Sequence, residues 1–264
     1  MDYTMKLTTL PPQSNRTLSP RETLPTMYDL PSEHIGLSQA GSLCHDEFHG
    51  LQGQFLFQTF QPKNYYPNRL FSAVDLYLYY DANHPKWYKR PDWFGVVDVS
   101  RLYEGKDSRL SYVIWQEQVT PLIVVELLSP GTEKEDLGQT QNEKGKPPTK
   151  WYVYEQILGV PYYVVFSRYT NKMQAFCLTG SGYQPAPLTD GRLVIPTVEL
   201  SLGLWEGNYQ GIHRPWLRWM TASGELIPLA SEALSAAEER ANTAEARAEK
   251  LAAKLRELGV DLDE

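Results

Sequence analysis

Two carboxylate residues occupy positions where the surrounding sequence predicts buried β-strands. Glu126 is the single charge in the apolar run 121–128, and Asp92 opens an aromatic strand that follows it directly. Side chains alternate along a strand, so Glu126 should share a face with Val124 and Leu128. A buried carboxylate without a partner costs several kcal/mol, so Glu126 should bind a cation or a metal.

Each of these acids also has an ordinary structural interpretation. Asp92 can cap a turn, and Glu126 can pair with an arginine or lie at a strand end, because structural ion pairs also perturb such groups. The strands that would position the two acids are predicted at 70–80, 93–99, 111–116 and 122–128. A helix is predicted over 149–158, with two prolines before it and Gly159 at its end.

Further strands are predicted at 162–166, 173–178 and 193–195, and residues 200–228 read as an irregular closing segment. The order of strands, one helix and more strands indicates an α/β or α+β domain with a mixed sheet. We expect a flexible N-terminal arm over residues 1–33, this domain over 34–228, and a separate C-terminal segment over 229–264.

Composition excludes several classes of protein. The 264 residues include 7 Trp, 17 Tyr and 8 Phe, which is incompatible with full disorder. No apolar run is long enough for a membrane helix, so we expect no membrane association. Two cysteines, Cys44 and Cys177, lie far apart and outside any metal or redox motif, which indicates reduced thiols in a cytoplasmic protein. The net charge of −7 disfavours non-specific coating of nucleic acid.

The two acids belong to a longer pattern. After Pro91-Asp92, the chain continues with Val125-Glu126-Leu-Leu-Ser-Pro130, a charged loop with Glu135-Asp136, then Lys150-Trp-Tyr-Val-Tyr154 and Gly159-Val-Pro-Tyr-Tyr163. This pattern resembles the PD-(D/E)XK nuclease superfamily and, more narrowly, its Uma-two family of restriction-endonuclease-like proteins. The resemblance runs from about residue 70 to residue 204 and implies a restriction-endonuclease-like mixed sheet with flanking helices.

The resemblance implies a role for each matching residue. Asp92 matches the motif aspartate and Glu126 the second acid, and together they would bind Mg²⁺, for which Mn²⁺ can substitute. The motif lysine is absent, because Leu128 stands in its place, and Lys150 occupies the position on the following helix that can replace it. Asp75 is a candidate additional acid, although a surface aspartate at a strand end explains it equally well. A metal lowers the pKa of a bound water and a lysine stabilises developing negative charge, which phosphodiester hydrolysis requires.

Three functions remain open at this point. The first is a Mg²⁺-dependent endonuclease that hydrolyses phosphodiester bonds in DNA. The second is a catalytically inactive nuclease-fold protein that binds DNA or a protein. The third is an adaptor that oligomerises through its C-terminal coiled coil and uses its domain as a scaffold, because fold alone does not establish activity.

The C-terminal segment differs in composition from the rest of the chain. Residues 229–264 are rich in Ala, Glu, Lys, Arg and Leu, with nine acidic and five basic residues. Apolar residues recur in alternating steps of four and three for about four heptads, which predicts a coiled-coil helix. We expect it to form a homodimer or to bind a partner helix. The stripe comprises Ala230, Leu234, Ala237, Ala241, Ala244, Ala248, Leu251, Leu255 and Leu258.

Overall fold

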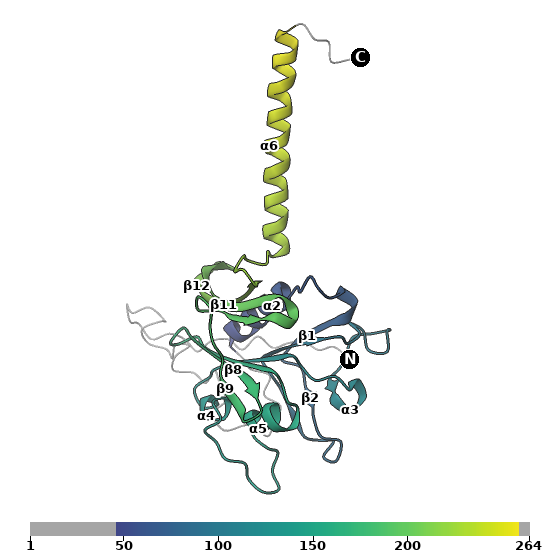
Figure 1. Ribbon diagram of the computed structural model, residues 1–264, viewed down its shortest axis with the longest axis vertical. Helices are drawn as coiled ribbons and strands as arrows, with labels where there is room; N and C mark the ends of the chain where they lie inside the picture. The colour runs from purple at the N-terminus through teal and green to yellow at the C-terminus, as the bar shows by residue number, and fades with distance from the viewer. Residues whose placement is uncertain (1–45, 259–264) are drawn as a thin grey trace, which may run out of the picture. The chain divides into compact units, whose positions relative to one another are not determined.

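The computed structural model describes residues 46–258, which form a mixed α/β fold (Figure 1). The expected N-terminal arm over residues 1–33, and Cys44, lie outside the described residues. The helices are α2 (Glu47–Thr59), α3 (Ile114–Glu117), α4 (Glu133–Asp136), α5 (Lys150–Tyr152) and α6 (Ala230–Glu257), with short turns at η1 (Pro67–Arg69), η2 (Val153–Ile157) and η3 (Pro196–Val198). The strands are β1 (Leu70–Val74), β2 (Leu78–Tyr79), β3 (Tyr88–Lys89), β4 (Trp93–Val97), β5 (Tyr112–Val113), β6 (Ile123–Leu127), β7 (Tyr162–Ser167), β8 (Lys172–Thr179), β9 (Gly182–Pro185), β10 (Leu193–Ile195), β11 (Leu200–Tyr209) and β12 (Ile212–Thr221).

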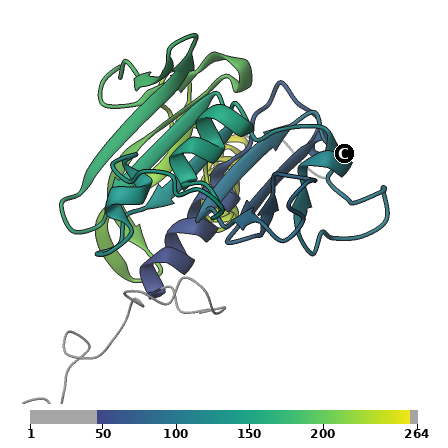
Figure 2. The same cartoon turned by 90° about the horizontal axis from the view of Figure 1, so that it is seen from below.

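The largest sheet has the order β1-β4-β6-β7-β8-β9. Figure 2 shows the fold turned by 90° from the view of Figure 1. Strands β6 and β7 pair in parallel and every other neighbouring pair in this sheet is antiparallel. The predicted mixed sheet is therefore present. Two three-stranded sheets accompany it, with the orders β10-β11-β12 and β3-β2-β5.

The two faces of the largest sheet carry two hydrophobic cores. On β6, Val125 and Leu127 pack into a core with helix α2 and the β11–β12 hairpin. Val124 and Leu128 pack on the opposite face, with the small β3-β2-β5 sheet and the α5–η2 segment. All five residues of β6 are buried, which explains why its sequence is apolar almost throughout.

The first predicted strand is interrupted. Residues 70–80 form β1 and β2, because Asp75 has a φ of 54° and turns the backbone between them. The predicted strand at 111–116 is only partly correct, since β5 ends at Val113 and the short helix α3 begins at the next residue.

Two further predictions are corrected by the structure. Residues 200–221 are not irregular but form a hairpin of two ten-residue strands, with Gln210 and Gly211 both at positive φ in its two-residue turn. The helix predicted over 149–158 is α-helical only at α5 and continues as the π-helical turn η2, in which Leu158 N donates to Val153 O at 2.9 Å. The side chain of Thr149 accepts a hydrogen bond from Tyr152 N and caps this segment.

The C-terminal segment is one continuous helix of 28 residues, α6, as predicted for its secondary structure. Pairing of α6 into a coiled coil stays a prediction. Within residues 46–258, the helices lack the combination of length and apolar composition that a membrane-spanning helix requires.

Candidate active site

The strand register brings Asp92 and Glu126 to neighbouring positions on one face of the largest sheet. Trp93 on β4 is opposite Val125 on β6, so Asp92 and Glu126 follow as the next antiparallel pair of positions. The backbone confirms how closely β4 and β6 approach here, because Leu127 N donates to Asp92 Oδ2 at 2.6 Å. Both acids are buried, with 7 % of Asp92 and none of Glu126 exposed.

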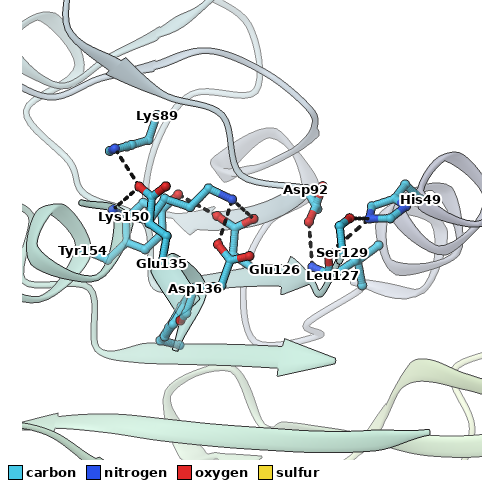
Figure 3. Close-up of polar contacts among 11 residues, drawn as sticks. His49, Lys89, Asp92, Glu126, Leu127, Ser129, Glu135, Asp136, Lys150 and Tyr154 are labelled. Carbon is cyan, nitrogen blue, oxygen red and sulfur yellow. Dashed lines mark hydrogen bonds and ion pairs between the residues drawn. The ribbon is translucent and has the colours of Figure 1, made fainter. Parts of the chain in front are cut away.

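Lys150 reaches Glu126 from the start of α5 (Figure 3). Its Nζ lies 3.0 Å from Glu126 Oε2 and 2.9 Å from Asp136 Oδ1. The side chain of Lys150 is 19 % exposed, so the ammonium group lies at the edge of the buried cluster. Sequence analysis predicted that Asp92, Glu126 and Lys150 converge, and the structure brings all three to one end of β6.

Two more groups hold Glu126 and the loop beside it. Tyr154, in the turn η2, donates its hydroxyl hydrogen to Glu126 Oε1 at 2.7 Å. A π-helical turn changes the direction of the side chains that follow α5, and such turns are frequent at functional sites. Asp136 ends α4, and its backbone carbonyl accepts a hydrogen bond from the Tyr163 hydroxyl at 2.9 Å.

The loop that carries Asp136 requires a glycine. Gly138 has a φ of 69°, and a Cβ at this position would lie 2.6 Å from the Trp151 ring. Only glycine allows the loop after α4 to pack this closely on α5. This contact keeps Asp136 within reach of Lys150.

A second ion pair flanks the first. Glu135 Oε1 accepts hydrogen bonds from the backbone N–H of Lys150 at 2.9 Å and from Lys89 Nζ at 3.2 Å. Burial by itself would raise the pKa of Glu135, but the ammonium groups of Lys89 and Lys150 outweigh burial and hold that pKa below its usual value. Glu135 is therefore an ionised anchor for the start of α5.

Burial and charge perturb the two central groups in different ways. Burial raises the pKa of Glu126 well above its usual value; Lys150 acts in the opposite direction, and Asp92 and Asp136 add to the increase. Burial disfavours the charged form of Lys150, but Asp136, Glu126 and Asp92 outweigh it and raise the pKa of Lys150 well above its usual value. Lys150 is thus a permanent cation beside a carboxylate whose charge is costly.

Asp75 contacts the site through its backbone. The N–H of Asp75 donates to Asp92 O at 3.2 Å, and its side chain forms an ion pair with Arg90. This arrangement favours a structural role for the Asp75 carboxylate. Asp75 as an additional catalytic acid stays a prediction.

Sequence reasoning did not assign site roles to Asp136, Tyr154 or His49. The His49 imidazole, from helix α2, lies with Nε2 3.1 Å from Leu127 O and 3.3 Å from Ser129 Oγ. His49 therefore links α2 to the backbone directly after Glu126. The sequence does show Asp136 beside Glu135 and Tyr154 four residues after Lys150. It does not show that either side chain points towards Glu126 or Lys150.

The comparison with protein families agrees with this geometry. The chain matches the Uma2 family, described as "Putative restriction endonuclease", over residues 40–210, and belongs to that family. The mixed sheet and its flanking helices are consistent with a restriction-endonuclease-like fold. Membership of this family suggests that the protein is a nuclease. A search of curated proteins finds no match to the chain.

Proposed function

We propose that this protein is a Mg²⁺-dependent endonuclease that hydrolyses phosphodiester bonds in DNA. The observation that carries the proposal is the contact of Lys150 Nζ with Glu126 Oε2 at 3.0 Å, beside Asp92, in a chain of the Uma2 family. Lys150 thereby supplies, from a helix, the ammonium group that Leu128 cannot supply from β6. The fold thus assembles two acids and a lysine in spite of the altered motif.

The charges of the site fit a divalent cation. Asp92, Glu126 and Asp136 are each less than 10 % exposed, and among residues 46–258 Lys150 is the single cation in contact with both Glu126 and Asp136. Carboxylate oxygens are the ligands that Mg²⁺ prefers, and Mn²⁺ can replace it. Asp92 and Glu126 would hold the ion, which when bound supplies charge neutralisation and a lower pKa for its water.

Two protein carboxylates are a sufficient set of ligands for this ion. In residues 46–258, no group of three or more His, Cys, Asp or Glu side chains is arranged as a complete metal site. Mg²⁺ usually keeps several waters and binds through one or two carboxylates together with substrate phosphates. A site with two acids is therefore consistent with a metal that binds together with DNA.

The residues of the chain itself have defined tasks in this chemistry. Lys150 Nζ donates a hydrogen bond to Glu126 and forms an ion pair with Asp136, and its ammonium group has a further N–H for a water or a phosphate oxygen. Its positive charge would stabilise the negative charge that develops on the phosphate oxygens. Tyr154 and Leu127 N fix the carboxylates of Glu126 and Asp92, respectively, so both acids are positioned before substrate binds.

Plasmid cleavage tests the proposal. Purified protein should nick supercoiled DNA with Mg²⁺ or Mn²⁺ and not with EDTA, and Glu126→Gln should abolish nicking because it removes the charge and keeps the volume. Glu117→Gln is the matched control, since Glu117, like Glu126, forms an ion pair with a basic side chain, in this case the buried Arg109 at 2.7 Å. Equal nicking by wild type and Glu126→Gln would identify a contaminant and refute the nuclease. Affinity for DNA should be weak in moderate salt, because a chain with net charge −7 can neutralise few phosphates.

A catalytically inactive nuclease-fold adaptor is the second candidate. The observation that favours it is the complete burial of Glu126 together with its two hydrogen-bond partners, Lys150 and Tyr154. Such a protein would bind DNA or another protein without cutting and would oligomerise through residues 229–264. DNA binding that persists without any metal-dependent nicking would support it.

The proposed cytoplasmic location of the protein is based on Cys177, which is a free thiol.

A further inference from the structure

Helix α6 presents its whole heptad stripe to solvent. Leu234 is 60 % exposed, Leu251 53 % and Leu258 78 %, and the alanines between them are exposed as well. Exposed leucines at heptad spacing on a 28-residue helix are typical of a surface that a second helix covers. The rest of the chain in residues 46–258 does not cover this stripe.

The first turn of α6 is held by the domain. Arg218, which is completely buried on β12, forms an ion pair with Glu232, and Glu232 Oε2 also accepts a hydrogen bond from Leu229 N at 2.8 Å. Arg218 Nη2 donates to Ile227 O at 2.8 Å, so the segment that leads into α6 is fixed too. Figure 1 shows α6 continuing as one helix from this base. The stripe therefore begins directly at the domain.

The charges beside the stripe differ between its two sides. With Leu234 and Ala241 as heptad position a, the e positions hold Glu238 and Glu245. The following g positions are basic throughout: Arg240, Arg247 and Lys254. One edge of the stripe is thus acidic and the other basic.

The charged residues beside the stripe form few interactions within the described part of the chain. In the described part of the chain, no opposite charge pairs with Glu238, Glu245, Arg247 or Lys254, and the Arg240 guanidinium donates to the backbone carbonyl of Ala236 at 2.9 Å. Charged e and g positions set partner choice and orientation in coiled coils. The acidic and basic edges therefore specify what α6 binds.

We infer that two copies of this chain pair in parallel and in register through α6. In a parallel pair, a g residue faces the e residue five positions later on the other helix, so Arg240 meets Glu245 of the second copy, twice by symmetry. In an antiparallel pair, g faces g and e faces e, so basic residues would meet basic ones and acids would meet acids. The charge pattern is complementary only in the parallel orientation.

The apolar layers fit the same arrangement. In register, Leu234, Leu251 and Leu255 each meet their own copies, and the alanines between them allow the two backbones to approach closely. Because α6 is anchored at its first turn, the two domains are attached at the same end of the helix pair. The assembly then carries two copies of the Lys150–Glu126 site, and two sites suit cutting both strands of a duplex. The pairing itself does not depend on nuclease activity.

The mass of the full chain in solution tests the pairing. At tens of micromolar we expect twice the 30.2 kDa of one chain. Ala244→Lys, inside the stripe, should raise the dimer dissociation constant at least about tenfold. Ala246→Lys is the matched control, because it makes the same change two residues away on the opposite side of the helix. A monomeric full chain, or equal effects of the two variants, would overturn the inference.

Charge reversal tests the orientation. Arg240→Glu should weaken the dimer, because it would place two acids together at the contact with Glu245 of the second copy. Glu245→Arg should weaken it similarly, and an equimolar mixture of the two variants should pair as well as wild type. In an antiparallel dimer, Arg240→Glu would remove a repulsion and strengthen association, so that result would refute the parallel arrangement.

A disulfide provides an independent measurement of orientation. Leu258→Cys in the full chain should form a 258–258 bond between copies under mild oxidation, identified by peptide mass mapping so that the native cysteines can remain. Antiparallel helices would hold these two positions about 40 Å apart at opposite ends of the pair. Mapped linkage between the native cysteines alone, with no 258–258 bond in a dimeric sample, would count against in-register pairing.

Discussion

The Lys150 ammonium lies 3.0 Å from Glu126 Oε2, although 24 residues and a charged loop separate the two along the chain. Glu126 comes from the centre of the largest sheet, and Lys150 from the first turn of a helix that covers one of its faces. A second ion pair, between Lys89 and Glu135, holds the start of that helix in place. The fold therefore places an ammonium group beside Glu126 from a helix rather than from β6.

Removal of the Lys150 charge should destabilise the protein in a pH-dependent way. Lys150→Met leaves the buried carboxylates of Glu126 and Asp136 without their cation, which should cost about 3 kcal/mol at neutral pH. The folded variant would hold protons on these acids to a higher pH than the unfolded chain does, so its unfolding free energy should fall as pH rises above the ordinary carboxyl range. Urea unfolding at pH 5 and pH 8 measures this; an equal loss at both pH values would contradict it.

The pH profile of nicking should reflect the perturbed Glu126. Burial raises the pKa of Glu126 well above its usual value, and the carboxylate must be ionised to bind a cation. Activity should therefore increase with pH through a range higher than that of an ordinary glutamate. Because metal binding competes with protonation, more Mg²⁺ should move the acidic limb to lower pH. A limb that does not respond to Mg²⁺ would argue against a metal on Glu126.

The Tyr154 hydroxyl should stabilise the charged form of Glu126. Tyr154→Phe removes a 2.7 Å hydrogen bond to Oε1, so we expect a loss of about 1.5–3 kcal/mol in stability and a nicking profile displaced to higher pH. Tyr112→Phe is the control, because its hydroxyl donates to Val119 O at 2.9 Å and lacks a contact with Glu126. The control should lower stability without moving the pH profile. Identical profiles for both variants would refute the role of Tyr154.

Asp75 should contribute to structure more than to chemistry. Asp75→Asn keeps a residue that tolerates the left-handed backbone at φ 54° but weakens the ion pair with Arg90. We expect a lower melting temperature, and a nicking rate within about twofold of wild type because the contacts of Glu126 and Lys150 are untouched. Loss of nicking at unchanged stability would instead make Asp75 an additional catalytic acid.

Sequence patterns identified the parts of the fold that local chemistry determines. A charge inside the apolar run of β6 marked Glu126, and strand alternation placed it correctly on the face of Val124 and Leu128. Two prolines and Thr149 marked the start of the helix that carries Lys150. These patterns are local, so they can be recognised in the sequence without knowledge of the tertiary structure.

The remaining features depend on contacts between distant segments. Asp136 joins the site because Gly138 packs on Trp151, and Tyr154 reaches Glu126 because a π-helical turn redirects it. The β11–β12 hairpin turns at Gln210 and Gly211, a pair less diagnostic than Asn-Gly, so its strands were missed. Each of these features requires knowledge of what packs against the segment.

The proposed chemistry depends most directly on a divalent cation at Asp92 and Glu126. Crystals of the full chain soaked in Mn²⁺ and measured at the manganese absorption edge would locate the ion without reference to activity. We predict an anomalous peak within bonding distance, about 2.2 Å, of carboxylate oxygens from both residues, and its absence in crystals of Glu126→Gln. Crystals saturated with Mn²⁺ that show no peak between Asp92 and Glu126 would contradict the proposed metal-dependent nuclease.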